Sequence, residues 1–508
     1  MIKFIAKVSR ILIGIIFIFS GFVKAVDPLG SKYKFSDYFF AMDISWLDSF
    51  ALFFAVLMSG VEFIIGIMLL FNFQKKLSRW LVLLFMSFFT ILTLWIALKN
   101  PVTDCGCFGD AIILSNWETF YKNLIIMIFV ITLFVSNIES EKLFAKIIKN
   151  ATIIAFWGGL AVLIIYFINT LVLFDTLFYV GIIALTMCIA YFKIGKTFCC
   201  KVEIAITSAI FILITLFSIY CYRHLPIIDF RPFKNGNYIL DYTRPIETAN
   251  FIIVNNSKIV LLNESNRIKA TLKNKVVDIK MPIKTRWDIF ITDKEGNELE
   301  KINTKNVNNY SLELSKYNYD TLYLNIGVPQ EESIYYYTMK NIKDNSELEI
   351  TSKEYMDKKI WEDTSYVFIT EKTKGPYVIK EGYEPPVHEI IFRDNSGNEY
   401  DEELLLVDEY VFVIVSYNIS DASAEALKGI NNLIKKSLNK YKVIGLSASN
   451  FNDIEKITKK YNLNVPFYWA DDITLKTMIR SNPGIMLFRK GVVINKWHYN
   501  DIDEVKVP

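Results

Sequence analysis

The segment from Phe50 to Phe73 reads FALFFAVLMSGVEFIIGIMLLFNF and carries one charged side chain, Glu62. A helix needs about 20 predominantly apolar residues to cross the hydrocarbon core of a bilayer. The segment therefore predicts a membrane-spanning helix. A carboxylate in such a helix is costly, and it marks either a polar pathway or an ion pair inside a bundle. In the second case, Arg10 and Lys24 are the two cations that we expect to pair with it.

Six further apolar stretches have the length of a membrane span, or nearly so. They are Val8–Val26, Leu77–Leu98, Phe120–Val135, Ala151–Leu173, Thr176–Phe192 and Ile204–Tyr222. No small-x-small cleavage site stands at the end of the first stretch, so we expect it to be retained as a span. The pattern predicts an α-helical transmembrane bundle of about seven spans.

Charged residues are distributed unevenly along the chain. Residues 1–225 hold 18 lysines and arginines and 12 acids, whereas the remaining residues hold 38 and 41. This difference predicts a membrane part followed by soluble domains. The sequence has no run or face of basic residues, which disfavours nucleic-acid binding. The 13 prolines, 21 glycines and 6 cysteines exclude collagenous, disordered and disulfide-scaffold proteins.

The positive-inside rule gives the orientation of the expected spans. With a cytoplasmic N-terminus, the segments inside carry 12 lysines and arginines and the segments outside carry 6. We therefore expect a protein of the bacterial inner (plasma) membrane whose soluble C-terminal domains are extracytoplasmic, in the periplasm.

The loop after the third expected span reads DCGCFGD, from Asp104 to Asp110. In this orientation Cys105 and Cys107 lie outside the cytoplasm, where disulfides persist. Gly106 supplies the backbone freedom that a disulfide across one intervening residue requires. Strained, exposed disulfides are the labile or catalytic ones, so the loop predicts a thiol–disulfide exchange centre. A structural disulfide and half of a metal site are the alternatives, and metal is the weaker because the three histidines lie far away in sequence.

Residues 1–138 resemble the DoxX/MauE group of membrane redox-associated proteins. The resemblance rests on four spans, on Gly21-Phe-Val-Lys24 at the end of the first, on the glutamate of the second, and on CGCFGD before the fourth. It implies disulfide or quinone-linked electron transfer in the cell envelope. The stretch Tyr222–Pro232 resembles multi-domain DoxX-type proteins. Residues 139–225 add transmembrane helices that the resemblance does not explain.

Residues 226–330 alternate between apolar and polar side chains, with turn-forming clusters between the runs. The strands that we expect are Asn250–Val254, Lys258–Leu262, Asp288–Thr292 and Thr321–Asn325. This pattern predicts a small extracytoplasmic β-rich domain without a catalytic constellation. Residues 331–387 are predicted to form further strands and a linker.

From residue 388 to 508 strand and helix patterns alternate. The apolar run Glu409–Ser416 is typical of a buried parallel strand, and Ala422–Asn439 has helical spacing. The order resembles the thioredoxin fold, with Pro483 at the place of that family's cis-proline. Tyr417-Asn-Ile-Ser-Asp-Ala422 stands where the family has Cys-x-x-Cys, so this domain holds no thiolate for redox chemistry. We expect a docking platform, or a domain kept for packing alone. The residues expected to form the docking surface are Tyr417, Asn418, Asn482 and Pro483.

Together these features predict an envelope membrane protein that exchanges disulfides through Cys105 and Cys107 with a thiol-containing envelope protein. A partner thiolate attacks one sulfur of the pair, and the second cysteine resolves the mixed disulfide. The competing interpretation is a non-enzymatic membrane assembly or sensor component in which the pair is structural. Lipid surrounds the spans, no metal site is expected, and quinone is the cofactor that the resemblance suggests.

Overall fold

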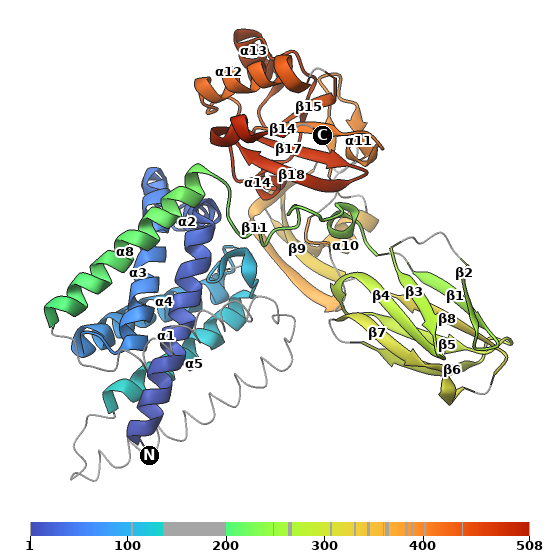
Figure 1. Ribbon diagram of the computed structural model, residues 1–508, viewed down its shortest axis with the longest axis horizontal. Helices are drawn as coiled ribbons and strands as arrows, with labels where there is room; N and C mark the ends of the chain where they lie inside the picture. Colours follow the sequence, from blue (N-terminus) through green and yellow to red (C-terminus); the bar gives the residue numbers. More distant parts are fainter. Residues whose placement is uncertain are drawn as a thin grey trace. The chain divides into compact units, whose positions relative to one another are not determined.

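The computed structural model describes residues 2–102, 105–135 and 200–508, apart from short gaps in the last range. These gaps are 247, 263–266, 305–306, 318, 330–331, 343–345, 359, 361–364, 381–384, 388–389, 401–402, 439 and 507. The chain separates into two compact units (Figure 1). The first is Met1–Ile239 together with Ile390–Pro508, and the second is Leu240–Glu389. The first unit is therefore built from two stretches of chain that flank the second.

The N-terminal part of the first unit is helical. Its helices are α1 (Ile2–Val26), α2 (Pro28–Ala41), α3 (Ala51–Phe71), α4 (Lys75–Lys99), α5 (Asn116–Val135) and α8 (Cys200–Arg223). Four helices in the described chain are long and apolar enough to cross a membrane. They cover Ser45–Phe71, Lys75–Lys99, Asn116–Val135 and Lys201–Arg223, and they correspond to the second, third, fourth and seventh expected spans.

Of the seven expected spans, these four are confirmed as helices long and apolar enough to cross a membrane. The first expected span is the 25-residue helix α1, which packs against α3, α5 and α8 but is not among the four. The fifth and sixth expected spans, Ala151–Leu173 and Thr176–Phe192, lie outside the described residues. The full count stays a prediction.

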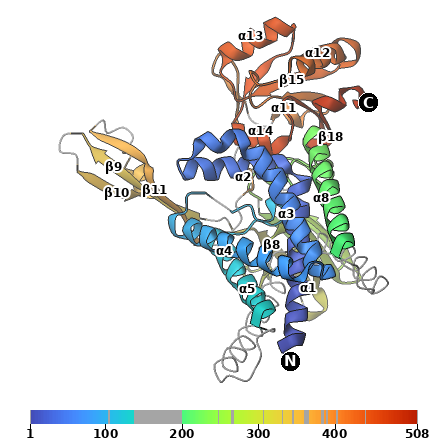
Figure 2. The same cartoon turned by 90° about the vertical axis from the view of Figure 1, so that its left-hand side faces the viewer.

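Helices α1 and α3 lie side by side (Figure 1 and Figure 2) because glycines leave room between their backbones. A Cβ atom at Gly21 would lie 2.5 Å from the backbone nitrogen of Phe63, and one at Gly66 would lie 2.6 Å from that of Ile18. Side chains at these two positions would push the helices apart. Their contact continues into an apolar core shared with α4 and α5 that includes Phe129.

Helix α2 is an element that the sequence analysis did not assign. The Asp27 side chain accepts a hydrogen bond from the backbone nitrogen of Gly30 at 2.9 Å, and Pro28 occupies the first helical position. Both are established features of helix N-termini, because they satisfy or avoid the unpaired N–H groups there. The helix places its side chains beside the cysteine loop.

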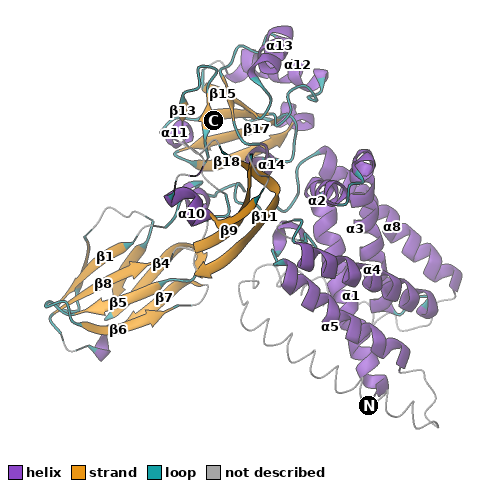
Figure 3. Cartoon of the chain, turned by 180° about the vertical axis from the view of Figure 1, so that it is seen from behind, coloured by secondary structure: helices purple, strands orange, loops and turns teal. Residues whose placement is uncertain are grey.

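The second unit consists mainly of antiparallel strands (Figure 3). The first two sheets have strand orders β2-β1-β8-β5-β6 and β3-β4-β7, and they share an apolar core around Trp287. A third sheet has the order β10-β9-β11. The four expected strands are β1, β2, β5 and β8, which are neighbours in the first sheet. The strands are β1 (Ala249–Val254), β2 (Lys258–Leu261), β3 (Lys269–Lys273), β4 (Val276–Thr285), β5 (Asp288–Thr292), β6 (Glu298–Asn303), β7 (Val307–Glu313), β8 (Thr321–Gly327), β9 (Glu332–Asn341), β10 (Glu347–Thr351) and β11 (Tyr366–Lys380), with short helices α9 (Leu240–Thr243) and α10 (Ser352–Asp357).

The C-terminal part of the first unit is a mixed α/β structure with the strand order β13-β12-β16-β15-β14-β17-β18. Strand β14 is parallel to β15, and β17 and β18 continue the sheet in antiparallel fashion. All five residues of β14 are buried, as its apolar sequence predicts. The peptide bond between Asn482 and Pro483 is cis. The elements are β12 (Phe392–Arg393), β13 (Glu399–Tyr400), α11 (Glu403–Leu406), β14 (Val411–Val415), α12 (Ala424–Leu433), β15 (Lys442–Ser447), α13 (Phe451–Tyr461), β16 (Phe467–Trp469), α14 (Asp472–Met478), β17 (Gly484–Arg489) and β18 (Val492–His498).

We expect Gly21→Ala to destabilise the helical bundle, because its new methyl group meets the backbone of α3. Overpacking of this kind costs about 1–3 kcal/mol, although alanine favours a helix over glycine by about 1 kcal/mol. Thermal unfolding of the full-length protein in detergent, followed by circular dichroism, measures the effect. Ala209→Val adds bulk at an exposed position of α8 and is the control. A Gly21→Ala protein as stable as the control would contradict the close approach.

Candidate functional site

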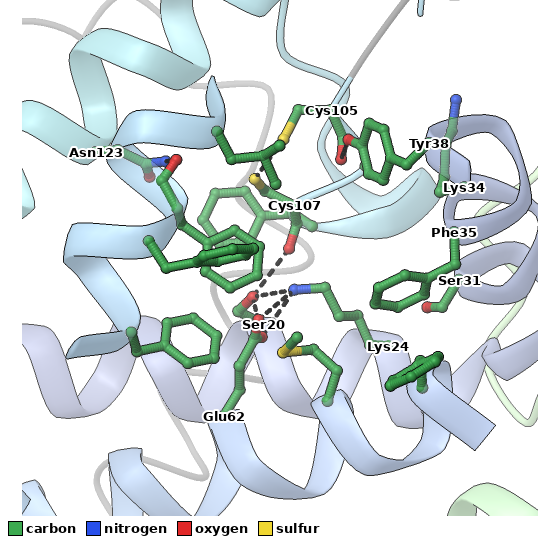
Figure 4. Close-up of a pocket in the computed structure, with 18 of the residues that line it drawn as sticks. Ser20, Lys24, Ser31, Lys34, Phe35, Tyr38, Glu62, Cys105, Cys107 and Asn123 are labelled. Carbon is green, nitrogen blue, oxygen red and sulfur yellow. Dashed lines mark hydrogen bonds and ion pairs between the residues drawn. The ribbon is translucent and has the colours of Figure 1, made fainter. Parts of the chain in front are cut away.

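Cys105 and Cys107 lie together in the loop between α4 and α5 (Figure 4). Their sulfur atoms are 3.0 Å apart and share a hydrogen bond, and both cysteines are free. The intervening Gly106 has φ +62°, a left-handed conformation that favours glycine. A Cβ atom on Gly106 would also lie 2.9 Å from the Lys34 side chain. Glycine is therefore required here by backbone conformation and by space.

The two thiols differ in acidity. The hydrogen bond from Cys105 lowers the pKa of Cys107 to about 6, with support from the positive charges of Lys122 and Lys24, although burial acts in the opposite direction. The same hydrogen bond, together with burial, raises the pKa of Cys105. The pair thus favours one thiolate, on Cys107, stabilised by a protonated Cys105. A thiolate at neutral pH is what nucleophilic thiol chemistry requires.

A buried ion pair supports the loop from below in Figure 4. The Lys24 ammonium lies 2.8 Å from both carboxylate oxygens of Glu62 and donates to the Ser20 hydroxyl at 2.9 Å. The Ser20 hydroxyl lies 2.6 Å from Glu62 Oε2 and 2.9 Å from the carbonyl oxygen of Cys107. Ser20 and Lys24 are one helical turn apart on α1, so they reach the same point. The network connects α1, α3 and the backbone of Cys107.

Helices α2 and α5 hold the loop on its other sides. The Tyr38 hydroxyl donates to the carbonyl oxygen of Cys105 at 2.5 Å. The Lys122 ammonium lies 4.4 Å from the centre of the Phe108 ring, within the range of a cation–π contact. Side chains from two different helices therefore hold the loop backbone at Cys105 and the ring of Phe108.

The cysteine pair borders a largely apolar cavity of about 380 Å³. The cavity wall is formed mainly by aromatic and aliphatic side chains of α1 to α5. Its polar groups include Ser20, Lys24, Glu62, Lys122 and Asn123. Pockets of this size, apolar with a few placed polar groups, are typical of small-molecule sites.

Arg10, the other cation considered for Glu62, lies elsewhere. Its guanidinium donates to the carbonyl oxygens of Leu69 and Leu70 at 2.6 and 3.1 Å, near the C-terminal end of α3. Carbonyl groups in the last turn of a helix lack the usual intrahelical partner, and that of Leu69 also accepts from the backbone nitrogen of Asn72 at 3.2 Å. Arg10 thus stabilises the α1–α3 contact away from the cysteines.

The expected docking residues of the C-terminal part lie close to one another, and they make contacts within the chain. The Asn482 side chain accepts from the Ser416 hydroxyl at 2.8 Å and donates to the Asn418 carbonyl oxygen at 2.7 Å. The Tyr417 ring packs edge-on against Tyr33 of α2, with centroids 6.4 Å apart. Pro483 follows Asn482 through the cis bond. Part of the expected surface therefore faces this chain's own membrane part.

Several residues of the site were not expected from the sequence: Ser20, Lys34, Tyr38 and Lys122. Ser20 has a sequence pattern that could have found it, because it stands four residues before Lys24 and shares its helix face. Lys34 and Tyr38 come from α2, which is distant from the loop in sequence, and Lys122 comes from α5, the helix that follows the loop. Among the described residues, no three His, Cys, Asp or Glu side chains gather as a metal site.

Residues 2–136 match the family described as Methylamine utilisation protein MauE. The match covers α1 to α5 and includes both cysteines and the buried ion pair. The expected resemblance to MauE is thereby confirmed for this part of the chain, and the match together with the apolar helices identifies a membrane protein. No curated protein matches the chain.

We expect alkylation of Cys107 to be half-maximal near pH 6, because the thiolate reacts and its pKa is lowered to about 6. Cys105→Ala removes the hydrogen bond that lowers this pKa most, so the profile should move to higher pH. Peptide mass spectrometry after iodoacetamide pulses at a series of pH values measures both profiles. Cys221→Ala removes another free cysteine and is the control. Half-maximal reaction of native Cys107 near the ordinary thiol value of about 8.5 would contradict the assignment.

Proposed function

We propose that this protein is a membrane thiol–disulfide exchange protein that oxidises thiols of an extracytoplasmic partner through Cys105 and Cys107. The observation that carries the proposal is the 3.0 Å pair of sulfur atoms, one with a lowered pKa, at the wall of an apolar cavity. A merely structural pair requires neither the acidity difference nor the cavity. The MauE family name refers to methylamine utilisation, and we propose for this chain only the thiol chemistry that its loop supports.

The exchange begins with the pair in its disulfide form. A partner thiolate attacks Cys107 Sγ, the Cys105–Cys107 bond breaks, and Cys105 leaves and takes up a proton. The partner's second thiolate then attacks the partner sulfur of the mixed disulfide, and Cys107 leaves as a thiolate. The partner loses two electrons and gains a disulfide, while the pair gains the two electrons. The low pKa of Cys107 favours the second step, since a more acidic thiol leaves faster.

The cavity fits a quinone-class acceptor, which supplies a two-electron, two-proton sink for the reduced pair. Phe35, Phe85 and Phe89 would contact an aromatic ring, and Lys24 and Asn123 would provide donors to its oxygens. The cavity wall also includes Phe88, which is 61% exposed on the outside of α4. An apolar molecule in the bilayer therefore has a route to the cysteines that does not cross water.

For residues 388–508 we propose a thioredoxin-like domain that docks partners without redox chemistry of its own. Two parallel strand pairs and the antiparallel β17 and β18 support this assignment. The segment from Tyr417 to Ala422 contains no cysteine. This domain would bring a partner to the loop, and the thiol chemistry would stay with Cys105 and Cys107.

The decisive variant is Cys107→Ser. Purified full-length protein in detergent should catalyse reduction of a short-chain quinone by dithiothreitol, measured by absorbance above the uncatalysed rate. We expect Cys107→Ser to fall to the uncatalysed rate, because Cys105 alone cannot form the intramolecular disulfide that dithiothreitol reduces. Cys221→Ser should retain the native rate. Equal rates in native protein and Cys107→Ser would favour the alternative, an assembly or sensor component with a structural cysteine pair.

The orientation has a separate test. A membrane-impermeant maleimide applied to spheroplasts after mild reduction should label Cys105 and Cys107, because we place their loop outside the cytoplasm. Cys199 and Cys200 precede the last span on the proposed cytoplasmic side and should stay unlabelled until the membrane is permeabilised. The opposite labelling pattern would place the soluble domains in the cytoplasm. Cys105 and Cys107 would then lack the oxidising environment that the proposed exchange requires.

A further inference from the structure

A single arginine of the C-terminal α/β part reaches both sides of the cysteine loop. Arg480 follows α14 and is buried, and its Nε lies 3.1 and 2.9 Å from the two carboxylate oxygens of Asp27. Its Nη2 lies 3.0 Å from Asp110 Oδ2, and its Nη1 donates to the Lys476 carbonyl oxygen at 2.5 Å. A buried guanidinium is tolerated only when its donors are satisfied, and here all three nitrogens have partners.

The two carboxylates belong to the elements that hold the loop. Asp110 is the last residue of CGCFGD and lies three residues after Cys107. Asp27 caps the N-terminus of α2, the helix whose Tyr38 hydroxyl binds the Cys105 carbonyl oxygen. Arg480 therefore links the end of the loop to the helix beside it.

The arginine also neutralises negative charge at the end of the cysteine loop. Burial raises the pKa of Asp110, and Arg480 opposes that rise. Without Arg480, two carboxylates would remain near the loop, and Arg231 and Lys34 would be the remaining cations that act on Asp110. Negative charge beside a thiolate disfavours its ionised form.

We propose that Arg480 is a positioning residue for the thiol pair: it pairs with Asp27 and Asp110, and through them it holds α2 and the loop in the arrangement in which Cys107 reacts. This inference rests on the proposed function. It gives the C-terminal α/β part a role in the membrane part's chemistry, in addition to any docking of partners. Arg480 itself touches neither sulfur.

The test is the pH profile of Cys107 alkylation in full-length protein. The charged groups that act on Cys107 directly are Lys24 of α1, Glu62 of α3 and Lys122 of α5, and all stay unchanged. Arg480→Gln should shift the profile to higher pH. A shift of about one pH unit makes alkylation at pH 6 about fivefold slower. Arg489→Gln, which removes a half-exposed arginine paired with Asp408 in the same part of the chain, is the matched control.

Two further variants separate charge from folding. Arg480→Lys keeps the positive charge but not the planar fork that reaches two carboxylates at once, so it should shift the profile less than Arg480→Gln. Adding Asp110→Asn to Arg480→Gln removes one uncompensated carboxylate and should recover part of the native profile. If Arg480→Gln does not fold, Arg480→Lys becomes the test of the inference. A native pH profile of Cys107 alkylation in Arg480→Lys would then overturn it.

The result is distinguishable from failure of the proposed function. The thiol chemistry itself would be contradicted if Cys107 of the native protein is not alkylated at low pH and the native protein does not catalyse quinone reduction. A native protein with both properties, and an Arg480→Gln protein whose profile equals that of Arg489→Gln, would overturn only the role of Arg480.

Discussion

The ion pair between Lys24 and Glu62 is the interaction on which the site depends. Both side chains are almost fully removed from solvent, at 12% and 5% exposure. Breaking a buried pair by removing one partner typically costs about 3–5 kcal/mol, because the other charge stays behind unpaired. Here the loss of one partner would also disturb Ser20, whose hydroxyl connects the ion pair to the Cys107 carbonyl oxygen. The charge pair thus helps to hold the backbone of Cys107 in place.

The geometry of that pair depends in turn on helix contact. Gly21 stands one turn before Lys24 and lets α1 approach the backbone of α3, on which Glu62 lies. A wider separation would leave the ammonium and the carboxylate too far apart for direct contact. Helix packing, ion pairing and the position of Cys107 therefore all depend on the small residues at this contact, Gly21 and Gly66. The lowered pKa of Cys107 also draws on Lys24, so the same lysine serves structure and electrostatics.

Local sequence patterns were sufficient for the long apolar helices, for part of the strands and for the centre of the site. Apolar length identified four helices that the structure confirms, and alternation identified β1, β2, β5 and β8. Cys105 and Cys107 were visible because a single glycine separates them in sequence, and Lys24 because a carboxylate in an apolar helix demands a cation. Helix α2 was missed because it is not apolar enough to be a span, although Asp27 and Pro28 mark its start.

The distant contacts were beyond sequence reasoning for a physical reason. Arg480 is one of 56 lysines and arginines, and Asp27 is one of 53 acids. Nothing local distinguishes this arginine from the exposed Arg489, because its partners are determined only when the fold brings α2, the loop and α14 together. The same holds for Tyr38 and Lys122. Their roles arise from tertiary position, whereas residue type alone suggests ordinary surface or membrane-boundary side chains.

The discontinuous first unit has a consequence for biogenesis. Asp110 and Arg480 are separated by 370 residues, and a ribosome adds residues at roughly 5–20 per second. The cysteine loop is therefore synthesised roughly 20–70 seconds before its arginine exists. During that interval the nascent loop lacks its contact with the C-terminal α/β part, and the second unit is translated in between. The order of synthesis therefore leaves a period in which the cysteine loop exists without Arg480 and the membrane part has to fold around it alone.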